Sequence, residues 1–561
     1  MRSPLLFLAL AAALHAAPPA EPAPQPATPA SAKPAVPSPM PASPAPATAP
    51  STTYQPQPKS PAAPTPELNI RTLGAIGDGQ PHPVSEWIAA KKYKNLHDIQ
   101  RDYPFVTSLD WSADEAAFQR ALHDLPPAGG TIRIPAGKYI ATAYGWRIYR
   151  DHVRLLGAGF RNTTLTTGPK LEEGLVLAPY RHVGWLLGAD AEYPFASDSG
   201  INGDDKVRLR EPARVAEFQP GELVFIRNGA CRFDQDYGEF NEIAGTTTDG
   251  DIVLKHPLSR DYTLPSFNWA NQTAAEFQFP PLGKTATLRV RNGDGFFELP
   301  AQGAITVGEA LLDIVNRKGD SITLRNPGHN NPPPGSVLPI GTVIGTSRSV
   351  IKLTRTTRDF HAEGLRVYGR RKALNVSNSY GSSFLDCDFV RSPDVTVKGG
   401  LTIDGDGGRF AEFTRCTVRG TEPCGMQFAR SFGNITFTDC TFAATNVAFS
   451  EFCFSGTLLH SSLAVSSSLG QAIIIGRSCG DLRIEDNQIV VSGGPINIFD
   501  ASCDIQSHKL DAPGGLTIRN NRIVATIKPR IFLLRSDRPA DISGNTLNGQ
   551  PAEPPGAKTS P

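Results

Sequence analysis

Charged side chains that could act on a polymeric substrate recur in consecutive repeats of the C-terminal half. Short apolar-x-apolar triplets predict buried strands, and the residues just after these strands include Asp404, Asp406, Arg430 and Glu451. If the strands stack about 4.8 Å apart, side chains at matching positions form a row on the outer face. The row then places a cation between carboxylates, with Asp404 or Asp406 about 9.6 Å from Glu451 across two repeats.

Three roles for this row stay open. β-Elimination on a uronate needs a cation beside the sugar carboxylate and a base at the C5 proton. Arg430 would be the cation or base, and Asp404, Asp406 and Glu451 would be acids, bases or cation ligands. Hydrolysis with inversion needs two carboxyl groups about 6.5–9.5 Å apart, which the spacing permits. A structural ion-pair ladder is the third role, although exposed pairs contribute at most about 1 kcal/mol each.

Substrate contacts are expected from polar residues on the same face and from a basic edge beside it. The predicted outward stripe consists of Asn375, Thr402, Gln427, Ala448, Ile474, Asn497 and Phe532. The residues expected to bind substrate are Asn375, Asn378, Gln427, Arg477, Asn497 and Asp500 on the face, and Arg371 and Lys398 on the edge. A basic edge favours an anionic polysaccharide.

A metal site is possible at one point of the row. Asp404-Gly-Asp406 begins like a calcium loop, but Gly408 stands where the third ligand belongs and no Glu closes the loop. A dedicated calcium loop is therefore not expected, whereas a Ca²⁺ site formed by Asp404, Asp406 and neighbouring repeats stays open. No other cofactor is expected, because no Cys or His spacing typical of zinc occurs.

The elements that position these residues belong to a repeat that recurs every ~21–34 residues from Phe360 onward, which is typical of a solenoid. One position in the repeat is always Cys, Ser or Asn, and we expect it to be a corner: Cys387, Cys416, Cys440, Ser461, Asn487, Asn521 and Asn545. Cys453, Cys479 and Cys503 form a second row. Each row of cysteines is interpreted either as stacked free thiols or as one disulfide with one thiol left over.

Composition and charge set the cellular context. The chain has 561 residues and a formal net charge of +1 from 55 basic and 54 acidic side chains, so it lacks the basic footprint of a nucleic-acid-binding protein. Residues 1–16 read as a signal peptide, which predicts a secreted protein, periplasmic or extracellular. No segment is apolar over ~18 residues, so no membrane span is expected.

The remaining boundaries follow from composition. Residues 17–66 are rich in Pro and Ala and are interpreted as a disordered linker, and residues 550–561 as a disordered tail. The folded part is then 67–549, with an insertion at about 283–347 that we expect to form a small β module.

The start of the folded part carries a specific pattern. Ser112 to Glu115 reads as a capping box, in which Ser112 caps the Glu115 amide and Glu115 reaches back. The motifs around it are NIRTLGAIGDG (69–79), DEAAFQRAL (114–122), GGTIRIPAGKY (129–139) and HVRLLGAGFRNTTL (152–165). In this order they resemble the N-terminal cap and first coils of the pectate lyase-like superfamily. The resemblance implies an all-β fold, a single-stranded right-handed parallel β-helix with an N-terminal capping helix.

The resemblance and the charged row together predict a secreted polysaccharide-degrading enzyme. We expect a lyase that cleaves an anionic, uronate-containing glycan by β-elimination. The alternatives are a glycoside hydrolase on the same scaffold and a non-catalytic carbohydrate-binding or surface-structural β-helix. A homotrimer is also open, because tailspike relatives of this superfamily are often trimers.

Overall fold

The computed structural model describes most of the chain after residue 65. The described residues are 66–177, 192–194, 203–209, 212–228, 238–258, 266–292, 303–307, 310–326, 333–346, 351–377, 379–391, 401–420, 425–429, 433–449, 453–466, 470–476, 479, 481–493, 496–500, 515–527, 529–533 and 540–552. The predicted signal peptide, the linker up to residue 65 and residues 553–561 lie outside these ranges.

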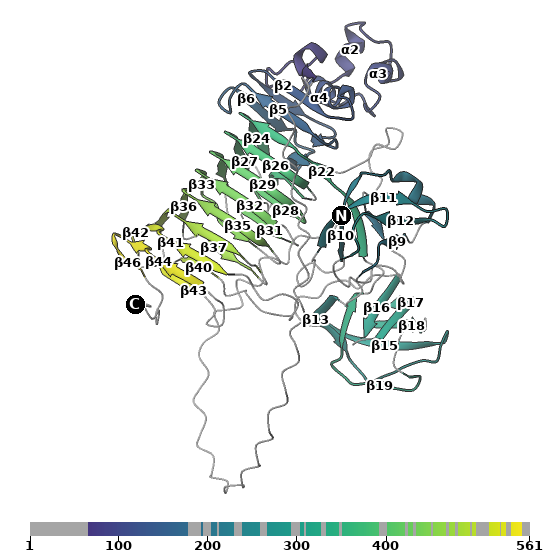
Figure 1. Cartoon of the computed structure of the whole chain (residues 1–561). Helices are drawn as coiled ribbons and strands as arrows, with labels where there is room; N and C mark the ends of the chain where they lie inside the picture. The colour runs from purple at the N-terminus through teal and green to yellow at the C-terminus, as the bar shows by residue number, and fades with distance from the viewer. Residues whose placement is uncertain are drawn as a thin grey trace. The chain divides into compact units, whose positions relative to one another are not determined.

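Three long sheets of parallel strands confirm the parallel β-helix (Figure 1). The first contains β1 (Glu67–Asn69), β2 (Gly130–Ile134), β5 (Val153–Gly157), β23 (His361–Glu363), β26 (Ser379–Leu385), β29 (Arg409–Thr414), β32 (Gly433–Thr438), β35 (Phe454–Leu459), β38 (Leu482–Glu485), β41 (Leu516–Arg519) and β44 (Ala540–Ser543), with β22 (Thr357–Arg358) beside β26. The second contains β3 (Gly137–Ala141), β6 (Thr163–Thr167), β24 (Arg366–Gly369), β27 (Asp388–Arg391), β30 (Thr417–Arg419), β33 (Thr441–Ala443), β36 (Ser462–Ser466), β39 (Gln488–Ser492), β42 (Arg522–Ala525), β45 (Thr546–Leu547) and β46 (Gln550–Pro551). The third contains β4 (Trp146–Ile148), β7 (Glu173–Leu177), β25 (Lys372–Asn375), β28 (Ile403–Asp406), β31 (Met426–Ala429), β34 (Val447–Phe449), β37 (Gln471–Ile475), β40 (Asn497–Asp500) and β43 (Arg530–Leu533).

The last strand, β46, lies beyond residue 549, where the folded part was predicted to end. β46 pairs antiparallel with β45, and Ala552 is buried. Residues 550–552 therefore belong to the folded part and not to the tail predicted at 550–561.

The corner between the first and second sheets repeats as the sequence predicts. In each described repeat a residue with φ between +48° and +66° comes first, as Asp386, Arg415, Asp439, His460, Asp486, Asn520 or Gly544. The buried Cys, Ser or Asn follows. Asn521 shows why Asn suits the place: its Nδ2 donates to Ile484 O at 2.8 Å and to Asn545 Oδ1 at 2.9 Å, and its Oδ1 accepts from Asn487 N at 3.1 Å. Each corner amide is thus satisfied by the next coil.

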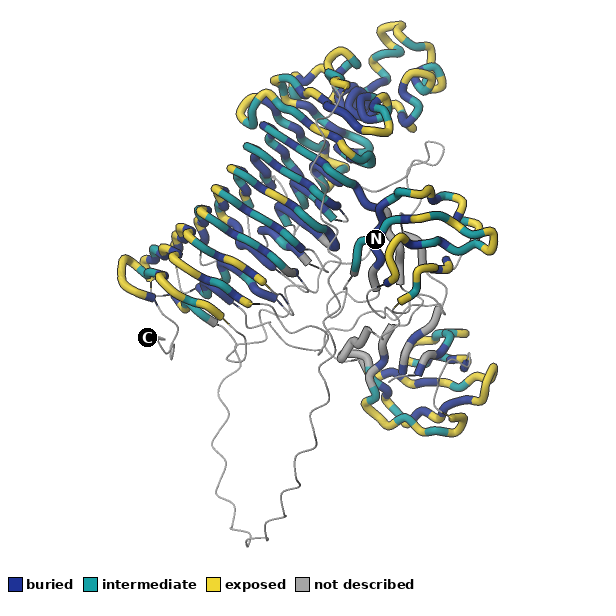
Figure 2. The backbone as a smooth tube through the Cα atoms, viewed as in Figure 1, coloured by how far each residue is buried: buried dark blue, intermediate teal, exposed yellow. Residues whose placement is uncertain are grey.

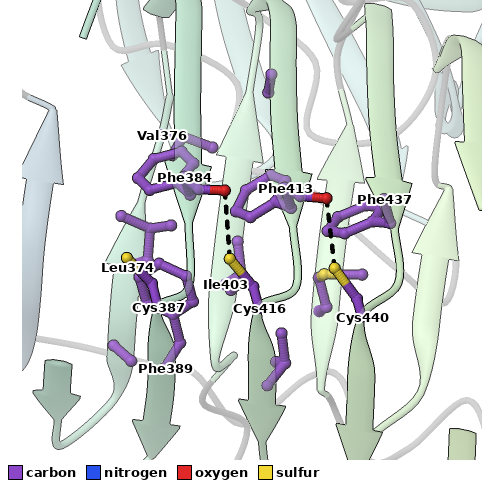
Figure 3. Packing of buried hydrophobic residues seen from close by; sticks show 14 of the residues in the cluster. Leu374, Val376, Phe384, Cys387, Phe389, Ile403, Phe413, Cys416, Phe437 and Cys440 are labelled. Atoms are coloured by element: carbon purple, nitrogen blue, oxygen red, sulfur yellow. Dashed lines mark hydrogen bonds between the residues drawn. The ribbon is translucent and has the colours of Figure 1, made fainter. Parts of the chain in front are cut away.

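The cysteine corners carry free thiols packed against a stack of aromatic rings. Cys416 and Cys440 donate to the carbonyls of Phe384 and Phe413, each at 3.4 Å (Figure 3). The rings of Phe384, Phe413 and Phe437 stack with centroids 4.7 and 4.6 Å apart. The stacked-thiol interpretation is confirmed for the first row, and burial raises the pKa of the Cys416 thiol.

In the second cysteine row, Cys453 and Cys479 are also free and buried. Burial raises the pKa of the Cys453 thiol, so thiolate chemistry is not favoured there. Cys503 lies outside the described residues.

An N-terminal cap closes the first coil. It consists of η1 (Ile70–Leu73), α2 (Ser85–Ala89), α3 (Leu96–Asp102) and α4 (Ala113–Asp124), and Figure 2 shows that α4 is buried along much of its length. Ser112 Oγ accepts from Glu115 N at 3.1 Å, as predicted for the capping box. The reciprocal half is wrong, because the Glu115 carboxylate accepts from the amides of residues 142–145 instead.

Two inserted modules lie between β7 and β22, each with a core of its own. The first is an antiparallel sheet of β8 (Glu192–Pro194), β9 (Lys206–Arg208), β10 (Leu223–Asn228), β11 (Gly238–Thr246), β12 (Asp251–Leu254) and β21 (Ile351–Arg355), accompanied by η2 (Pro212–Glu217). The second is a closed barrel of β13 (Ser266–Thr273), β15 (Thr285–Asn292), β16 (Gly303–Val307), β17 (Ala310–Lys318), β18 (Ser321–Arg325) and β20 (Val343–Thr346), with β14 (Phe277–Gln278) and β19 (Val337–Leu338) beside it. The predicted β module at about 283–347 is therefore this barrel, which begins earlier, at 266.

The first module contacts the β-helix through aromatic rings. Phe225 packs on Phe240 with centroids 4.8 Å apart, and Phe240 packs edge to face on Tyr380 at 5.0 Å. A Cβ on Gly407 would lie 2.5 Å from the Phe225 ring, so the β-helix has no side chain where this ring sits.

Replacing Asn521 by Ala tests the corner column. Asn521 is fully buried, and its loss leaves Ile484 O and the Asn487 amide without their partner. We expect the free energy of unfolding, measured by denaturant titration, to fall by about 2 kcal/mol or more. The control is Asn162→Ala, which removes an exposed hydrogen bond to Ala158 O and should cost less than about 1 kcal/mol. Equal losses would contradict a structural role for the column.

Candidate functional site

The outward stripe of the third sheet differs from the predicted one at three places. Strand pairing joins Arg147, Val176, Asn375, Asp404, Gln427, Ala448, Ile474, Asp500 and Leu533. Asn375, Gln427, Ala448 and Ile474 are placed as predicted, whereas Thr402, Asn497 and Phe532 are not in the stripe. Asp404 and Asp500, predicted to lie beside the stripe, are members of it.

Bulges explain the shift. The amides of Thr402 and Ile403 both donate to Gly425 O, at 2.6 and 3.4 Å, and both side chains are buried. Two consecutive inward residues break the alternation of the strand, so Thr402 is buried and Asp404 takes the outward place. Ile498 and Phe499 are likewise both buried, which moves Asp500 to the stripe.

Five of the predicted site residues lie outside the described residues: Asn378, Lys398, Arg430, Glu451 and Arg477. The backbone of Asp406 is part of β28, but its side chain is not described. The predicted cation between carboxylates therefore stays a prediction.

A cluster of opposite charges forms where the stripe passes from β7 to β28. Lys372 Nζ lies 2.6 Å from Asp404 Oδ2 and 3.3 Å from Glu173 Oε1. The two carboxylate oxygens are thus at most 5.9 Å apart, the two distances added. Asn375 Nδ2 donates to Glu173 Oε1 at 3.2 Å. We call Glu173, Lys372, Asn375 and Asp404 the charge cluster.

The charge cluster is sheltered from water. The side chains of Asp404, Lys372 and Glu173 are 11%, 18% and 25% exposed. Burial alone would lower the pKa of Lys372, but the charges of Asp404 and Glu173 outweigh it, and the pKa lies above its usual value. Lys372 therefore stays an ammonium at neutral pH and cannot accept a proton there.

A pocket of about 270 Å³ lies beside the charge cluster. Its lining residues are Tyr144, Gly145, Arg147, Lys170, Leu171, Glu172, Glu173 and Val176. Arg147 links the pocket to the cluster, since its Nη2 lies 4.0 Å from Glu173 Oε2. Its Nε donates to Tyr144 O at 3.0 Å, and its guanidinium carbon lies 5.2 Å from the centre of the Tyr144 ring. Tyr144 in turn stacks on Trp111.

The predicted basic edge also reaches this pocket. Arg371 pairs with Glu172 at 3.3 Å, and both side chains are exposed. Arg370 donates to Pro169 O, next to the lining residue Lys170. The edge and the pocket thus belong to one surface.

Asp500, near the far end of the stripe, has surroundings that differ from those of the charge cluster. Its Oδ2 accepts from Gln471 Nε2 at 2.6 Å and from Asn497 Nδ2 at 2.8 Å, and the residue is buried. Four repeats of ~4.8 Å separate it from Asp404, or about 19 Å. The structure therefore does not bring Asn497 and Asp500 together with the charge cluster.

The surroundings of the Asp404 side chain do not suit a Ca²⁺ ion. Calcium takes six to eight oxygen ligands, whereas Asp404 Oδ2 faces an ammonium at 2.6 Å. Within the described residues no group of three or more His, Cys, Asp or Glu side chains could hold a metal ion.

Sequence reasoning missed Glu173, Arg147 and Tyr144. The repeat rows begin at Phe360, and the inserted modules separate β7 from β25 in the chain. A signal was present, because Trp146-Arg-Ile148 and Leu175-Val-Leu177 are triplets of the same apolar-x-apolar form. If the repeat had been followed back across the insertion, these two triplets, and with them Arg147 and Glu173, would have been assigned to the same sheet as β25.

Comparison with known proteins gives no family assignment. No protein-family model matches the chain, and no curated protein matches its sequence. Similar solved structures include the tailspike gp61 of Pseudomonas phage phi297 (14% identity, 86% of this chain and 80% of that one, TM-score 0.25). They also include PfbA, a surface adhesin of Streptococcus pneumoniae (9%, 86% and 90%, 0.33), and the A-module of the Azotobacter vinelandii mannuronan C-5 epimerase AlgE4 (14%, 86% and 97%, 0.22). Likenesses of this size carry no argument about activity, so membership of the pectate lyase-like superfamily stays a prediction.

Replacing Lys372 by Met tests the charge cluster. Without the ammonium, two sheltered carboxylates lie near each other, and we expect a loss of about 1–3 kcal/mol at pH 7, less than the ~3–5 kcal/mol of a fully buried pair. The loss should shrink as the pH falls towards 4, because protonation relieves the repulsion. In the unsubstituted protein, the contribution linked to the raised Lys372 pKa is present at neutral pH and is lost as the pH rises above about 10.5.

Thermal unfolding of both proteins from pH 4 to pH 10 is the measurement. The matched control is Arg371→Met, which breaks the exposed pair with Glu172 and should cost at most about 1 kcal/mol at any pH. If the loss of stability in Lys372→Met does not change with pH, the two carboxylates do not repel each other, and the prediction is wrong.

Proposed function

We propose that the protein binds and degrades an anionic polysaccharide on the outward face of the third sheet, with the charge cluster and its pocket at the centre. The pocket carries the proposal. It is concave, it joins polar groups of both signs to a Tyr ring, and it adjoins a stripe whose repeat could follow a polymer. Binding sites for polar ligands combine a shaped cavity with a few fixed hydrogen-bonding groups, as this surface does.

The charge of the surface supports an anionic substrate. Five cations lie in or next to the pocket wall, Arg147, Lys170, Arg370, Arg371 and Lys372, among the carboxylates of Asp110, Glu172, Glu173, Asp404 and the buried Glu115. A uronate carboxylate would find several partners there. Positively charged side chains at a binding surface also raise the local concentration of an anionic polymer.

β-Elimination is the reaction that we propose on this surface. A cation neutralises the uronate carboxylate, which makes the C5 proton more acidic. A base removes that proton, the C4=C5 double bond forms as the C4–O bond breaks, and the leaving oxygen takes a proton from an acid or from water. Lys372 can supply positive charge but cannot be the base, because it stays protonated. Arg430 remains the proposed partner of the uronate carboxylate, and Glu451 or Asp406 the proposed base.

Hydrolysis is the second candidate, favoured by one distance. Glu173 and Asp404 present carboxylate oxygens at most 5.9 Å apart, a bound that includes the ~5–5.5 Å of retaining glycosidases. One of the two would have to hold a proton as the general acid. The ammonium between them stabilises both ionised forms, which is why we place elimination first.

Export and assembly complete the proposal. The signal peptide predicted at 1–16 would take the chain to the periplasm or the medium, and no helix of the described residues is long and apolar enough to cross a membrane. A homotrimer is proposed from the superfamily resemblance. Recovery of a chain shortened at its N-terminus from culture medium or periplasm tests the export, and light scattering tests the trimer.

Incubation with polygalacturonate and with alginate tests the activity. A lyase raises the absorbance near 235 nm, because elimination leaves an unsaturated uronate. Reducing ends without that absorbance would show hydrolysis and overturn elimination. Binding without either signal would leave a carbohydrate-binding protein, and the absence of binding would contradict the proposal.

Arg430→Ala tests the proposed catalytic cation. Loss of one transition-state contact should lower the rate ~100-fold or more, with little change in melting temperature. Arg415→Ala is the matched control, since Arg415 pairs with Asp386 at an exposed corner away from the third sheet. Full activity of Arg430→Ala would show that the catalytic cation lies elsewhere.

A further inference from the structure

The carboxylate of Glu115 is one of the most buried charged groups in the described chain. Glu115 is 0% exposed, and it accepts hydrogen bonds from four consecutive backbone amides. Oε2 receives the amides of Thr142 and Ala143 at 2.8 and 3.0 Å, and Oε1 receives those of Tyr144 and Gly145. Successive amides that converge in this way form a nest for an anion. Burial raises the pKa of Glu115, and the four amides oppose that rise.

Two of the four amides belong to residues in the wall of the pocket. All four form the turn between β3 and β4, and two of these residues, Tyr144 and Gly145, line the cavity. Gly145 has φ +95°, so the turn needs a residue tolerant of that backbone. Tyr144 O then accepts from Arg147 Nε at 3.0 Å, and Arg147 reaches towards Glu173 of the charge cluster.

A second side chain of α4 holds the same segment. Gln119 lies one helical turn after Glu115, and its Nε2 donates to the carbonyls of Gly145 and Arg147, each at 3.3 Å. Gln119 is buried as well. The turn is thus fixed on its amides by Glu115, and Gln119 fixes the carbonyl of its last residue and that of Arg147 in β4.

End-capping alone does not account for Glu115, because its neighbour already ties the cap to the first coil. Asp114 accepts the amides of Ile76, Gly77 and Ile140 at 2.7, 3.0 and 3.0 Å. It is also buried, at 2% exposed against 0% for Glu115, and none of its partners lines the pocket. A buried carboxylate is costly unless it is fully hydrogen-bonded, and α4 carries two side by side with different partners.

We propose that Glu115 is a positioning residue of the polysaccharide site: it fixes the turn 142–145 and, through Tyr144, the place of Arg147 in the pocket. The proposal rests on the proposed function for its ligand. Helix α4 then serves two purposes, since one face caps the β-helix and the Glu115–Gln119 pair shapes the binding surface.

Glu115→Gln and Asp114→Asn form the matched pair of variants. Each replaces a buried carboxylate by its amide, which offers one acceptor oxygen and turns an NH₂ group towards backbone amides. Hydrogen exchange of the backbone, followed by mass spectrometry of peptides that report residues 142–148 without the Ile140 amide, which Asp114 holds, measures the hold on the turn. Affinity electrophoresis in gels containing polygalacturonate measures binding, and thermal unfolding measures stability.

We expect both variants to lose similar melting temperature. In Glu115→Gln alone, the amides of residues 142–145 should exchange at least about tenfold faster, and the affinity for polygalacturonate should fall about tenfold, which corresponds to ~1.4 kcal/mol. Unchanged exchange at 142–145, or equal losses of affinity in the two variants, would overturn the proposal. If the unsubstituted protein does not bind polygalacturonate, the proposed function fails for this polymer, and the exchange result still decides whether Glu115 fixes the turn.

Discussion

In-register stacking of coils about 4.8 Å apart is the constraint on which the rest of the structure depends. It requires the backbone amides at each corner to find hydrogen-bond acceptors in a neighbouring coil. In the column of Ser461, Asn487, Asn521 and Asn545, the backbone amide of each of the first three residues donates to the side-chain oxygen of the Asn in the next coil. It also brings identical side chains face to face, as in the stacked rings of Phe384, Phe413 and Phe437. On the outer face, the same constraint forces polar residues of successive coils into rows.

The charge cluster is a product of this stacking across an interruption. Glu173 belongs to the last coil before the inserted modules, and Lys372 to the first coil after them, yet β7 and β25 pair directly. The insertion leaves the sheet continuous, so residues far apart in the chain share one sheltered ion pair. The cap acts on the same region from the other side, because α4 holds the turn that leads into β4. The centre of the proposed site thus lies where the cap meets the coils before the insertion and the first coil after it.

Sequence alone was sufficient for the repeating parts of this fold. The corner column follows from residue types that recur, and it is observed. The inward triplets are observed in part, with exceptions at residues 401–403 and 531–533. The outward register was only partly predictable. Strict alternation cannot show a bulge such as that at Thr402 and Ile403, which buries Thr402 and leaves Asp404 as the outward residue. The partner of the Glu115 carboxylate was also unpredictable, since a capping box and a nest have the same local sequence.

The site residues show the same limit. Asn375 and Asp404 were predicted and lie together, whereas Glu173 was missed because the repeat was read only after the insertion. Asn497 and Asp500 were predicted in the same groove, but they form a separate hydrogen-bonded group. Long-range pairing, which the chain order does not display, decided each of these outcomes.

The central claim is that a polysaccharide binds at the charge cluster and its pocket. A crystal structure of the protein with a bound uronate oligosaccharide tests it most directly. The account predicts a sugar residue in the pocket lined by Tyr144 and Arg147, with a uronate carboxylate within hydrogen-bond distance of Arg147 or Lys372. An oligosaccharide bound only on another sheet or on an inserted module, with this pocket empty, would contradict it.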